Sequence, residues 1–499
     1  MNPTTSSTDT SSRWLRLAPW LIFGLALVLR IPNLDYSFYG DEHFSLLRDS
    51  SRLITNTDDR FRPVFFSLLY LWRQIGFHGE IGLRLLPLLF GLAQIPLAWV
   101  LGRRIGGRSF AALFAFLVAT SPILIEFSQE VRPYSMVVVL ALVQMWVYLL
   151  LLERATALRW AGFVLVAVVG VYTHLHYWLF LAGFALSFWR ERRALPLWKG
   201  WGTLGAAVLL YLPNLPNLMI FAAKRGGSYS LHLPSAFPKL LGAVTVGFNY
   251  FALGDQGTGR PMGLADVQRN WLLALLALIP AAILLWSLVR LHARSRRTST
   301  LLLCHELSTV PVLLAFVASA VTGEYWLQPK YLIFVMPPVL LFIAIAFRAI
   351  EPRLLRRTTA VFGLAVLAVA MIHFWTPTQY SRRENWRRAV EVLQRDVGPS
   401  TAVLVLPAGY ELLRYYWPQV TEHWEIITVP RIAATSPIFA ADVRARLSGK
   451  NDVFYIWWDI PQNREDPQNV LLSNLKRIGT SGSVIHYTPR FKLYHWQLR

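Results

Sequence analysis

Apolar runs of about 20 residues recur along the first three quarters of the chain, separated by short clusters of arginine and lysine. A run of that length crosses the ~30 Å hydrocarbon core of a bilayer as one helix. Only 15% of the residues are charged, whereas a soluble domain carries about 25%. The sequence therefore predicts an α-helical polytopic membrane protein with about eleven transmembrane helices. The predicted spans are 14–31, 81–102, 109–127, 133–152, 159–173, 176–190, 201–221, 271–291, 301–321, 331–350 and 358–375.

The basic clusters give an orientation, because lysine and arginine are retained on the cytoplasmic side of membrane proteins. Every second connection between the predicted spans is basic, from Arg13 and Arg16 to Arg356 and Arg357. We therefore expect a cytoplasmic N-terminus and an uncleaved first span. The net charge of +21 gathers in such clusters, and no basic stripe with interleaved aromatic residues indicates a nucleic-acid partner.

Two domains are expected from the change in character near residue 376. Residues 1–375 are predicted to form the transmembrane domain, with outer loops at 32–80 and 222–270. Within the first loop, 62–78 is expected to be an amphipathic helix that lies on the membrane. Residues 376–499 are predicted to form a small extracytoplasmic α/β domain. Its predicted elements are helices at 382–395 and 411–417 and strands at 401–406, 425–429 and 453–458.

An acidic pair opens the first outer loop, in Tyr39-Gly40-Asp41-Glu42-His43. A carboxylate close to the membrane surface can act as a general base toward an acceptor hydroxyl. The alternative is an ordinary solvated acidic pair, since surface loops are often acidic.

A second pair of acids, Glu126 and Glu130, lies where two predicted spans meet with almost no loop between them. Their i,i+4 spacing predicts that both carboxylates share one helix face. Ionisable groups at membrane depth are costly, which favours a functional role. The structural alternative is an ion pair between Glu130 and Arg132.

His174 and His176 lie in the connection between the fifth and sixth predicted spans. A metal site needs three or four ligands, and no third histidine or cysteine is close in sequence. Interfacial hydrogen bonding is therefore favoured over metal binding, and phosphate binding is a third interpretation.

Arg132 and Lys330 are isolated cations in turns on the side where positive charge is depleted. Each could neutralise the phosphate of a lipid-linked leaving group. The alternative for Lys330 is an anchor that extends to the membrane interface. The glycine-rich segment 254–260 lacks the context of a phosphate-binding loop and is interpreted as a flexible outer loop.

With these residues in view, the chain resembles the GT-C glycosyltransferases. The likeness is to bacterial relatives of the dolichyl-phosphate-mannose protein mannosyltransferases and the lipid A aminoarabinose transferases, and it covers residues 14 to about 375. The features that carry it are Tyr39-Gly40-Asp41-Glu42, Arg62-Pro63 before an aromatic-rich helix, Ser128-Gln129-Glu130-Val131-Arg132-Pro133-Tyr134, and Lys330-Tyr331 opening a proline-containing span.

The resemblance implies a glycosyltransferase of the bacterial inner membrane that moves a hexosyl or pentosyl group. The sugar would pass from a polyprenyl-phosphate donor in the lipid bilayer to a lipid, glycan or protein acceptor on the extracytoplasmic face. It also implies no cofactor, although some GT-C branches use a divalent metal. By the same resemblance, the catalytic residues would be Asp41 as base, Glu42 and Glu130. The donor phosphate would be bound by Arg132, His174, His176, Lys330 and Tyr331, and the sugar or acceptor by Tyr39, Arg62 and Tyr134.

Three other functions fit the same composition. A transporter or flippase of lipid-linked sugars would explain the spans and the buried charges, but it predicts related halves and broken helices at the membrane midplane. A polymerase or ligase of lipid-linked glycans would still be a transferase. A non-catalytic relative would use the tail to bind a partner.

Overall fold

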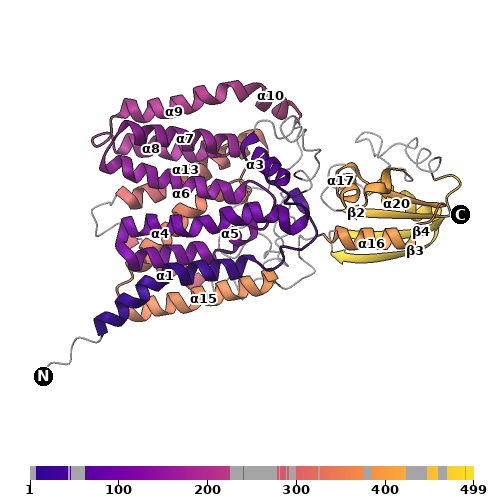
Figure 1. The fold of residues 1–499 in the computed structure, drawn as a ribbon, viewed down its shortest axis with the longest axis horizontal. Coiled ribbons are helices and arrows are strands. Elements are labelled where there is room, and N and C mark those ends of the chain that lie inside the picture. Colours follow the sequence, from indigo (N-terminus) through magenta and orange to yellow (C-terminus); the bar gives the residue numbers. More distant parts are fainter. Residues whose placement is uncertain are drawn as a thin grey trace. The chain divides into compact units, whose positions relative to one another are not determined.

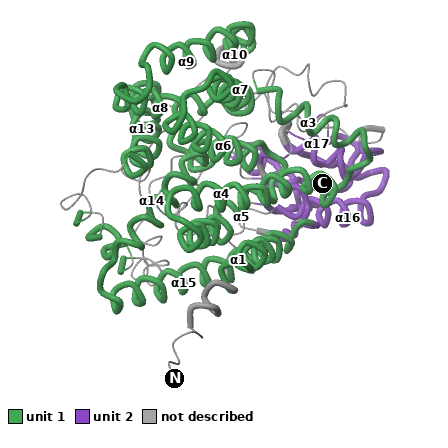
Figure 2. Tube along the Cα trace, turned by 60° about the vertical axis from the view of Figure 1, so that its left-hand side comes forward, with its two compact units in different colours: residues 1–34, 50–376 green, residues 35–49, 377–499 purple. Residues whose placement is uncertain are grey.

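The computed structural model describes most of the chain. The chain divides into two compact units (Figure 2), of which the first comprises residues 1–34 and 50–376 and the second residues 35–49 and 377–499. The described residues are 7–42, 45, 62–224, 240, 278–279, 281–287, 289–290, 299–323, 326–375, 384–422, 445, 447–458, 469–488 and 491–498.

The first unit is built from helices (Figure 1). Five of its helical segments are long and apolar enough to cross a membrane: 79–120, 134–153, 197–220, 299–322 and 353–372. This confirms a helical, multi-pass membrane protein. The helices are α1 (Ser7–Arg30), α3 (Pro63–Gln74), α4 (Gly79–Thr120), α5 (Pro122–Phe127), α6 (Tyr134–Glu153), α7 (Ala157–Thr173), α8 (Tyr177–Arg190), α9 (Leu197–Tyr211), η3 (Leu212–Asn214), α10 (Leu215–Lys224), α13 (Ser299–Thr322), η4 (Ile333–Val335), α14 (Met336–Arg348) and α15 (Arg353–Trp375).

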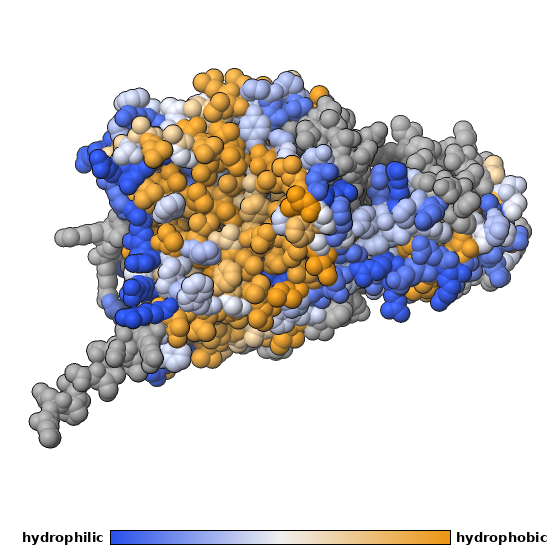
Figure 3. Space-filling model, viewed as in Figure 1, coloured by the Kyte–Doolittle hydropathy of each residue, from blue (hydrophilic) through white to orange (hydrophobic). Residues whose placement is uncertain are grey.

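The outer surface of this helical unit is apolar. Figure 3 shows a broad band of apolar side chains over the helices, with hydrophilic side chains gathered at the end where α1 begins. Exposed apolar residues of this kind include Leu165 of α7, Leu209 of α9 and Val321 of α13. Such a surface would aggregate in water and fits contact with lipid.

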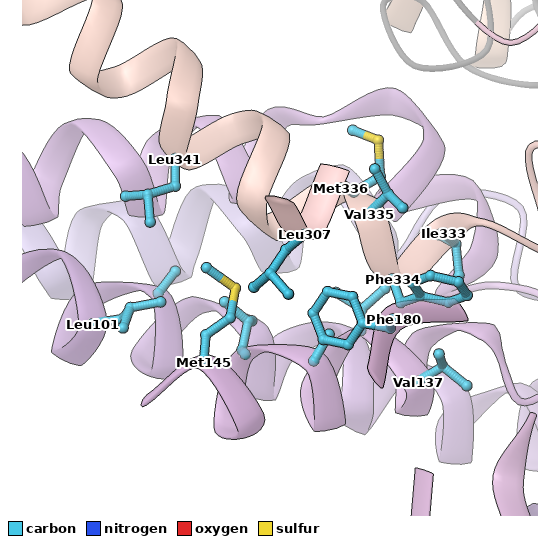
Figure 4. Packing of buried hydrophobic residues seen from close by; sticks show 14 of the residues in the cluster. Leu101, Val137, Met145, Phe180, Leu307, Ile333, Phe334, Val335, Met336 and Leu341 are labelled. Atoms are coloured by element: carbon cyan, nitrogen blue, oxygen red, sulfur yellow. The ribbon is translucent and has the colours of Figure 1, made fainter. Parts of the chain in front are cut away.

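The interior of the helical unit is a continuous apolar core. Leu101 of α4, Met145 of α6, Phe180 of α8 and Leu307 of α13 point toward one another (Figure 4). Small residues allow helical segments to approach closely. In α4, a Cβ on Gly102 would lie 2.8 Å from the backbone of Ala111, on the other side of the break at Gly106 and Gly107. Close packing of small residues is how helices associate in a membrane.

Helix α4 contains the turn between two predicted spans. Its helical geometry breaks at Gly106 and Gly107, and Gly107 has φ 77°, a left-handed conformation that favours glycine. Basic residues surround this break and the connections that follow α6 and α14. Arg104 pairs with Glu153 at the end of α6, and Arg348 of α14 donates 3.1 Å to the Ser109 hydroxyl. We call this side of the unit the basic end.

Two expectations about the third span are wrong. Helix α4 stops at Thr120, Ser121 is extended, and Pro122 begins a new helix, α5. Helix α5 ends at Phe127, so Glu126 and Glu130 do not share a helix face. The physical reason is local, because proline favours the first turn of a helix and disfavours helical geometry in the residue before it.

The short helix α3 covers most of the predicted amphipathic segment 62–78. Twelve residues rise only about 18 Å, too short to cross a bilayer. Its buried face carries Phe65, Phe66 and Leu69 and packs on α4 and α7. Its place on the membrane surface stays a prediction.

The second unit carries a mixed four-stranded sheet in the order β1-β2-β4-β3. Strands β1 and β2 are parallel, with Thr401 opposite Asp452, and the other two pairings are antiparallel. Leu471 and Leu475 of α20 pack on one face of the sheet. The elements are η1 (Gly40–Glu42), α16 (Trp386–Asp396), β1 (Thr401–Val405), α17 (Pro407–Tyr416), η5 (Pro418–Glu422), β2 (Asp452–Trp458), α20 (Val470–Ile478), β3 (Gly479–Thr488) and β4 (Phe491–Leu498).

This architecture confirms a small α/β unit in the tail. The helices and strands expected at 382–395, 401–406, 411–417 and 453–458 correspond to α16, β1, α17 and β2. The strand expected at 425–429 and the glycine-rich segment 254–260 lie outside the described residues. Strands β3 and β4 were not predicted.

Candidate functional site

The turn between α5 and α6, residues 128–133, is held by a buried polar network at the end opposite the basic end. The side-chain amide of Gln129 donates to the carbonyl oxygens of Arg30 and Pro32, each at 2.7 Å. Arg30 is buried and its Nη1 donates 2.8 Å to the Ala119 carbonyl. Because each bond satisfies a buried backbone group, the turn has a defined place against the end of α1.

A glycine makes room for this turn. A Cβ on Gly91 of α4 would lie 2.4 Å from the Cβ of Ser128 and 3.4 Å from Nε of Arg30. The Ser128 hydroxyl donates 2.6 Å to the Ile125 carbonyl and so closes the end of α5. The backbone N–H of Arg132 donates 2.6 Å to the Glu130 carbonyl in the tight turn before Pro133.

Three cations gather beside this turn. The guanidinium carbons of Arg62 and Arg132 lie 5.8 and 5.5 Å from the ring centroid of Phe66. The ammonium of Lys330 lies 5.4 Å from the ring centroid of Tyr331. Cation–π contact stabilises a positive charge against the face of an aromatic ring. Arg62, Arg132 and Lys330 form what we call the cation cluster.

Both predicted histidines lie next to the cation cluster. The rings of His174 and His176 are 5.3 Å apart, and Tyr331 lies 6.0 and 4.9 Å from them. Trp326 covers His176 at 5.0 Å, and Tyr134 lies 5.9 Å from His174. Residues from four separate parts of the sequence therefore meet at one place.

The charge state of His174 follows from this setting. Burial lowers its pKa well below 6.5, and the charges of His176, Arg62, Arg132 and Lys330 lower the pKa further. Its Nδ1 is buried and has no hydrogen-bond partner among the described residues. His174 is thus a neutral ring beside three cations, and its free nitrogen is a group that a ligand could satisfy.

The predicted acids of the helical unit are also buried. Glu126 is 2% exposed and Glu130 is 7% exposed. Among the described residues, no group of three or more histidine, cysteine, aspartate or glutamate side chains could hold a metal ion.

Asp41 and Glu42 belong to the second unit and have different surroundings. The Glu42 carboxylate is buried and accepts a 3.1 Å hydrogen bond from the backbone N–H of Tyr39. The Glu42 N–H donates 3.1 Å to the Tyr39 carbonyl, which closes the turn η1. Asp41 is only partly buried. Glu42 therefore shapes the turn, and Asp41 is the more exposed of the two acids. Tyr39 is buried beside Tyr36, with ring centroids 6.5 Å apart.

The helical unit brings together seven of the residues that the sequence indicated: Arg62, Arg132, Tyr134, His174, His176, Lys330 and Tyr331. Sequence reasoning missed the aromatic supports Phe66 and Trp326. Their signal was weak, because aromatic residues are common near membrane surfaces.

Glu306 of α13 is part of a helix-to-helix contact. The Glu306 carboxylate accepts 2.7 and 3.0 Å bonds from Arg190 and a 2.5 Å bond from Ser187. These bonds join α8 to α13. Cys304 is a buried free thiol.

Solved structures place the chain in a known architecture. It is similar to the Archaeoglobus fulgidus oligosaccharyltransferase AglB in complex with an inhibitory peptide and a dolichol-phosphate, at 14% identity, with 97% of this chain and 74% of that chain covered and a TM-score of 0.53. The complex of the Archaeoglobus fulgidus oligosaccharyltransferase with Zn and sulfate also has 14% identity and a TM-score of 0.53, covering 95% and 72%.

ArnT from Cupriavidus metallidurans bound to undecaprenyl phosphate is 15% identical over 95% of this chain and 97% of that chain, at a TM-score of 0.43. No family model matches the chain, and no curated protein matches it. The predicted resemblance to GT-C glycosyltransferases is therefore confirmed at the level of the fold, through the archaeal oligosaccharyltransferase.

Proposed function

We propose that this protein is a glycosyltransferase that takes a hexosyl or pentosyl group from a polyprenyl-phosphate donor. The observation that carries the proposal is the cation cluster around the neutral His174, at the end of the helical unit opposite the basic end. The fold supports it, since the similar oligosaccharyltransferase is solved with a dolichol-phosphate.

The charge change of the reaction explains the need for several cations. The donor is a phosphodiester with one negative charge, and the departing polyprenyl phosphate is a monoester with about 1.5 to 2 negative charges at pH 7. Arg132, Lys330 and Arg62 would stabilise the charge that develops on the leaving group. Tyr331, His174 and His176 would donate hydrogen bonds to the phosphate and line its binding site. Tyr134 would line the same site beside His174.

Asp41 is proposed as the base that takes the proton of the acceptor hydroxyl. Asp41 is only partly buried, whereas the buried carboxylate of Glu42 closes a turn, so we assign the role of base to Asp41 and a supporting role to Glu42. Glu130 is proposed as a second acid of the site. The acceptor class we propose is a lipid, glycan or protein on the extracytoplasmic face of a bacterial inner membrane, with no metal required.

The test is turnover by the purified protein with a panel of radiolabelled polyprenyl-phosphate sugars and crude cell envelope as acceptor. Asp41→Asn should lower sugar transfer about 10²-fold or more. Asp35→Asn is the matched control, because it removes an exposed carboxylate from the same loop, and it should keep wild-type turnover.

A second experiment tests the cation cluster by ligand binding alone, with no sugar transfer. Arg132→Gln should weaken binding of undecaprenyl phosphate by about 10-fold or more. Arg353→Gln removes an exposed charge at the basic end and should leave binding unchanged. Equal turnover by Asp41→Asn and wild type would remove Asp41 from the mechanism. Tight binding without turnover on a broad panel would favour a transporter of lipid-linked sugars.

A further inference from the structure

The segment that carries Asp41 packs with the C-terminal part of the chain. Residues 35–49 fall in the same compact unit as 377–499 (Figure 2), although they follow α1 directly in sequence. The tail is therefore part of the environment of the proposed base.

A tyrosine at the end of α17 makes the central contact. The Tyr416 hydroxyl accepts a 2.8 Å hydrogen bond from the backbone N–H of Phe38 and lies 3.3 Å from the Ser37 hydroxyl, which donates to it. The fully buried Phe38 ring meets Tyr415 edge-on, with centroids 5.3 Å apart. One hydroxyl thus binds the backbone of the loop three residues before Asp41.

The first turn of α16 provides a second attachment. The backbone N–H of Arg387 donates 3.2 Å to the Ser37 hydroxyl, which satisfies one of the free donors at a helix N-terminus. The Arg387 guanidinium donates 2.6 Å to the Asp35 carbonyl. Ser37 is therefore held by two helices of the tail at once.

These attachments continue to the acidic pair through two residues. Phe38 is bound by Tyr416, and its neighbour Tyr39 exchanges hydrogen bonds with both the backbone and the carboxylate of Glu42. The turn η1 that displays Asp41 is closed by these bonds. A shift at Phe38 is thus transmitted to Asp41 through one short, hydrogen-bonded turn.

The helix that carries Tyr416 is packed against the rest of its unit. Helix α17 directly follows β1, and Leu412 and Leu413 are buried. The N–H of Trp417 donates 2.8 Å to the Leu413 carbonyl and ends the helix at Tyr416. A site placed on a packed helix is more precisely positioned than one on a free loop.

We propose that Tyr416 is a positioning residue, through which the C-terminal domain fixes the orientation of the Asp41 carboxylate. The inference rests on the proposed function, because it assumes that Asp41 acts as the base. It gives the tail a role in the reaction itself, separate from any binding of a partner.

Tyr416→Phe removes the hydroxyl and keeps the ring. We expect kcat to fall about 10- to 100-fold, because small misplacement of a catalytic group has effects of that size. The KM for donor should stay within about twofold, because the cation cluster belongs to the helical unit. Amide hydrogen exchange of the peptide that covers 35–42 should accelerate roughly fivefold, the factor expected from one hydrogen bond.

The matched control is Tyr410→Phe in the same helix, since the Tyr410 hydroxyl makes no hydrogen bond within the described part of the chain. It should behave as wild type in all three measurements. Unchanged exchange or unchanged kcat in Tyr416→Phe overturns the inference, as does an equal loss in Tyr410→Phe.

The two hypotheses fail in different ways. If wild type turns over and Asp41→Asn does not, an active Tyr416→Phe removes only the positioning role. If Asp41→Asn is as active as wild type, the proposed base is wrong and the positioning role ends with it. If wild type transfers no sugar, the proposed function fails, and the exchange measurement still shows whether Tyr416 holds the loop.

Discussion

His174 gives the most direct test of the electrostatics of the cation cluster. It lies in the turn between α7 and α8, and burial together with the nearby positive charges lowers its pKa well below 6.5. The unfolded chain therefore takes up a proton near pH 6.5 that the folded protein does not bind. The contribution of His174 to the free energy of unfolding is fully present above pH 6.5. It is lost as the pH falls from 6.5 toward the pKa of His174 in the folded state.

The magnitude follows from the linkage relation. When one histidine stays neutral in the folded state, lowering the pH from 6.5 to about 5.5 reduces the free energy of unfolding by about 1 kcal/mol. His174→Gln removes the group and should flatten this part of the pH profile. His78→Gln is the control, because it deletes an exposed histidine and should leave the profile unchanged.

The assay is the thermal unfolding midpoint in detergent, measured at several pH values for the three proteins. Undecaprenyl phosphate should reduce the wild-type slope, because an anion at the cluster offsets the charge of Arg62, Arg132 and Lys330. A steep acid loss that persists in His174→Gln would refute the reasoning. The reasoning would also be refuted if polyprenyl phosphate binds to the wild type and leaves the slope of its unfolding midpoint against pH unchanged.

Two further predictions concern contacts between helices of the transmembrane domain. A Cβ on Gly170 would lie 2.2 Å from the ring of Tyr177 at the start of α8, so Gly170→Ala should destabilise the protein by about 1–3 kcal/mol. Gly162→Ala in the same helix meets nothing closer than 4.0 Å and should be neutral when unfolding midpoints are compared. Glu306→Gln replaces the partner of Arg190 at a site 11% exposed, and it should cost about 2 kcal/mol in the same assay. An unchanged midpoint would show that this pair contributes little.

The sequence predicts most of the helical unit, because apolar runs and basic clusters are patterns that can be read within short segments of the chain. It fails where a single residue changes the backbone. Ser121-Pro122 is a helix-start signal inside an apolar run, and the short helix that begins there ends at Phe127, before Glu130. Strand β4 alternates in character from Phe491 to Leu498, but its partner β3 is polar and contains glycine, which weakens the strand pattern.

Arg132 and Lys330 were visible in sequence because each is an isolated cation where positive charge is rare, and Arg62 was indicated by the resemblance alone. The cation cluster itself was not visible in the sequence, since it depends on contacts between segments far apart in the chain. The support of Arg132 by Phe66 joins two such segments. The contact of Tyr416 with Phe38 spans the whole transmembrane domain in sequence. No local pattern encodes it, because tyrosine at the end of a helix has many uses.

The arrangement of charge bears on the choice between a transferase and a transporter. Three cations lie beside the buried His174, and together they favour the binding of an anion. A flippase carries the same phosphodiester on both sides of the membrane, so one cation would match its cargo throughout. A transferase converts a singly charged diester into a monoester of higher charge, and extra cations stabilise the product side of the reaction and the transition state that leads to it. We therefore expect a cluster of several cations to serve the transfer of a sugar more than the transport of its donor.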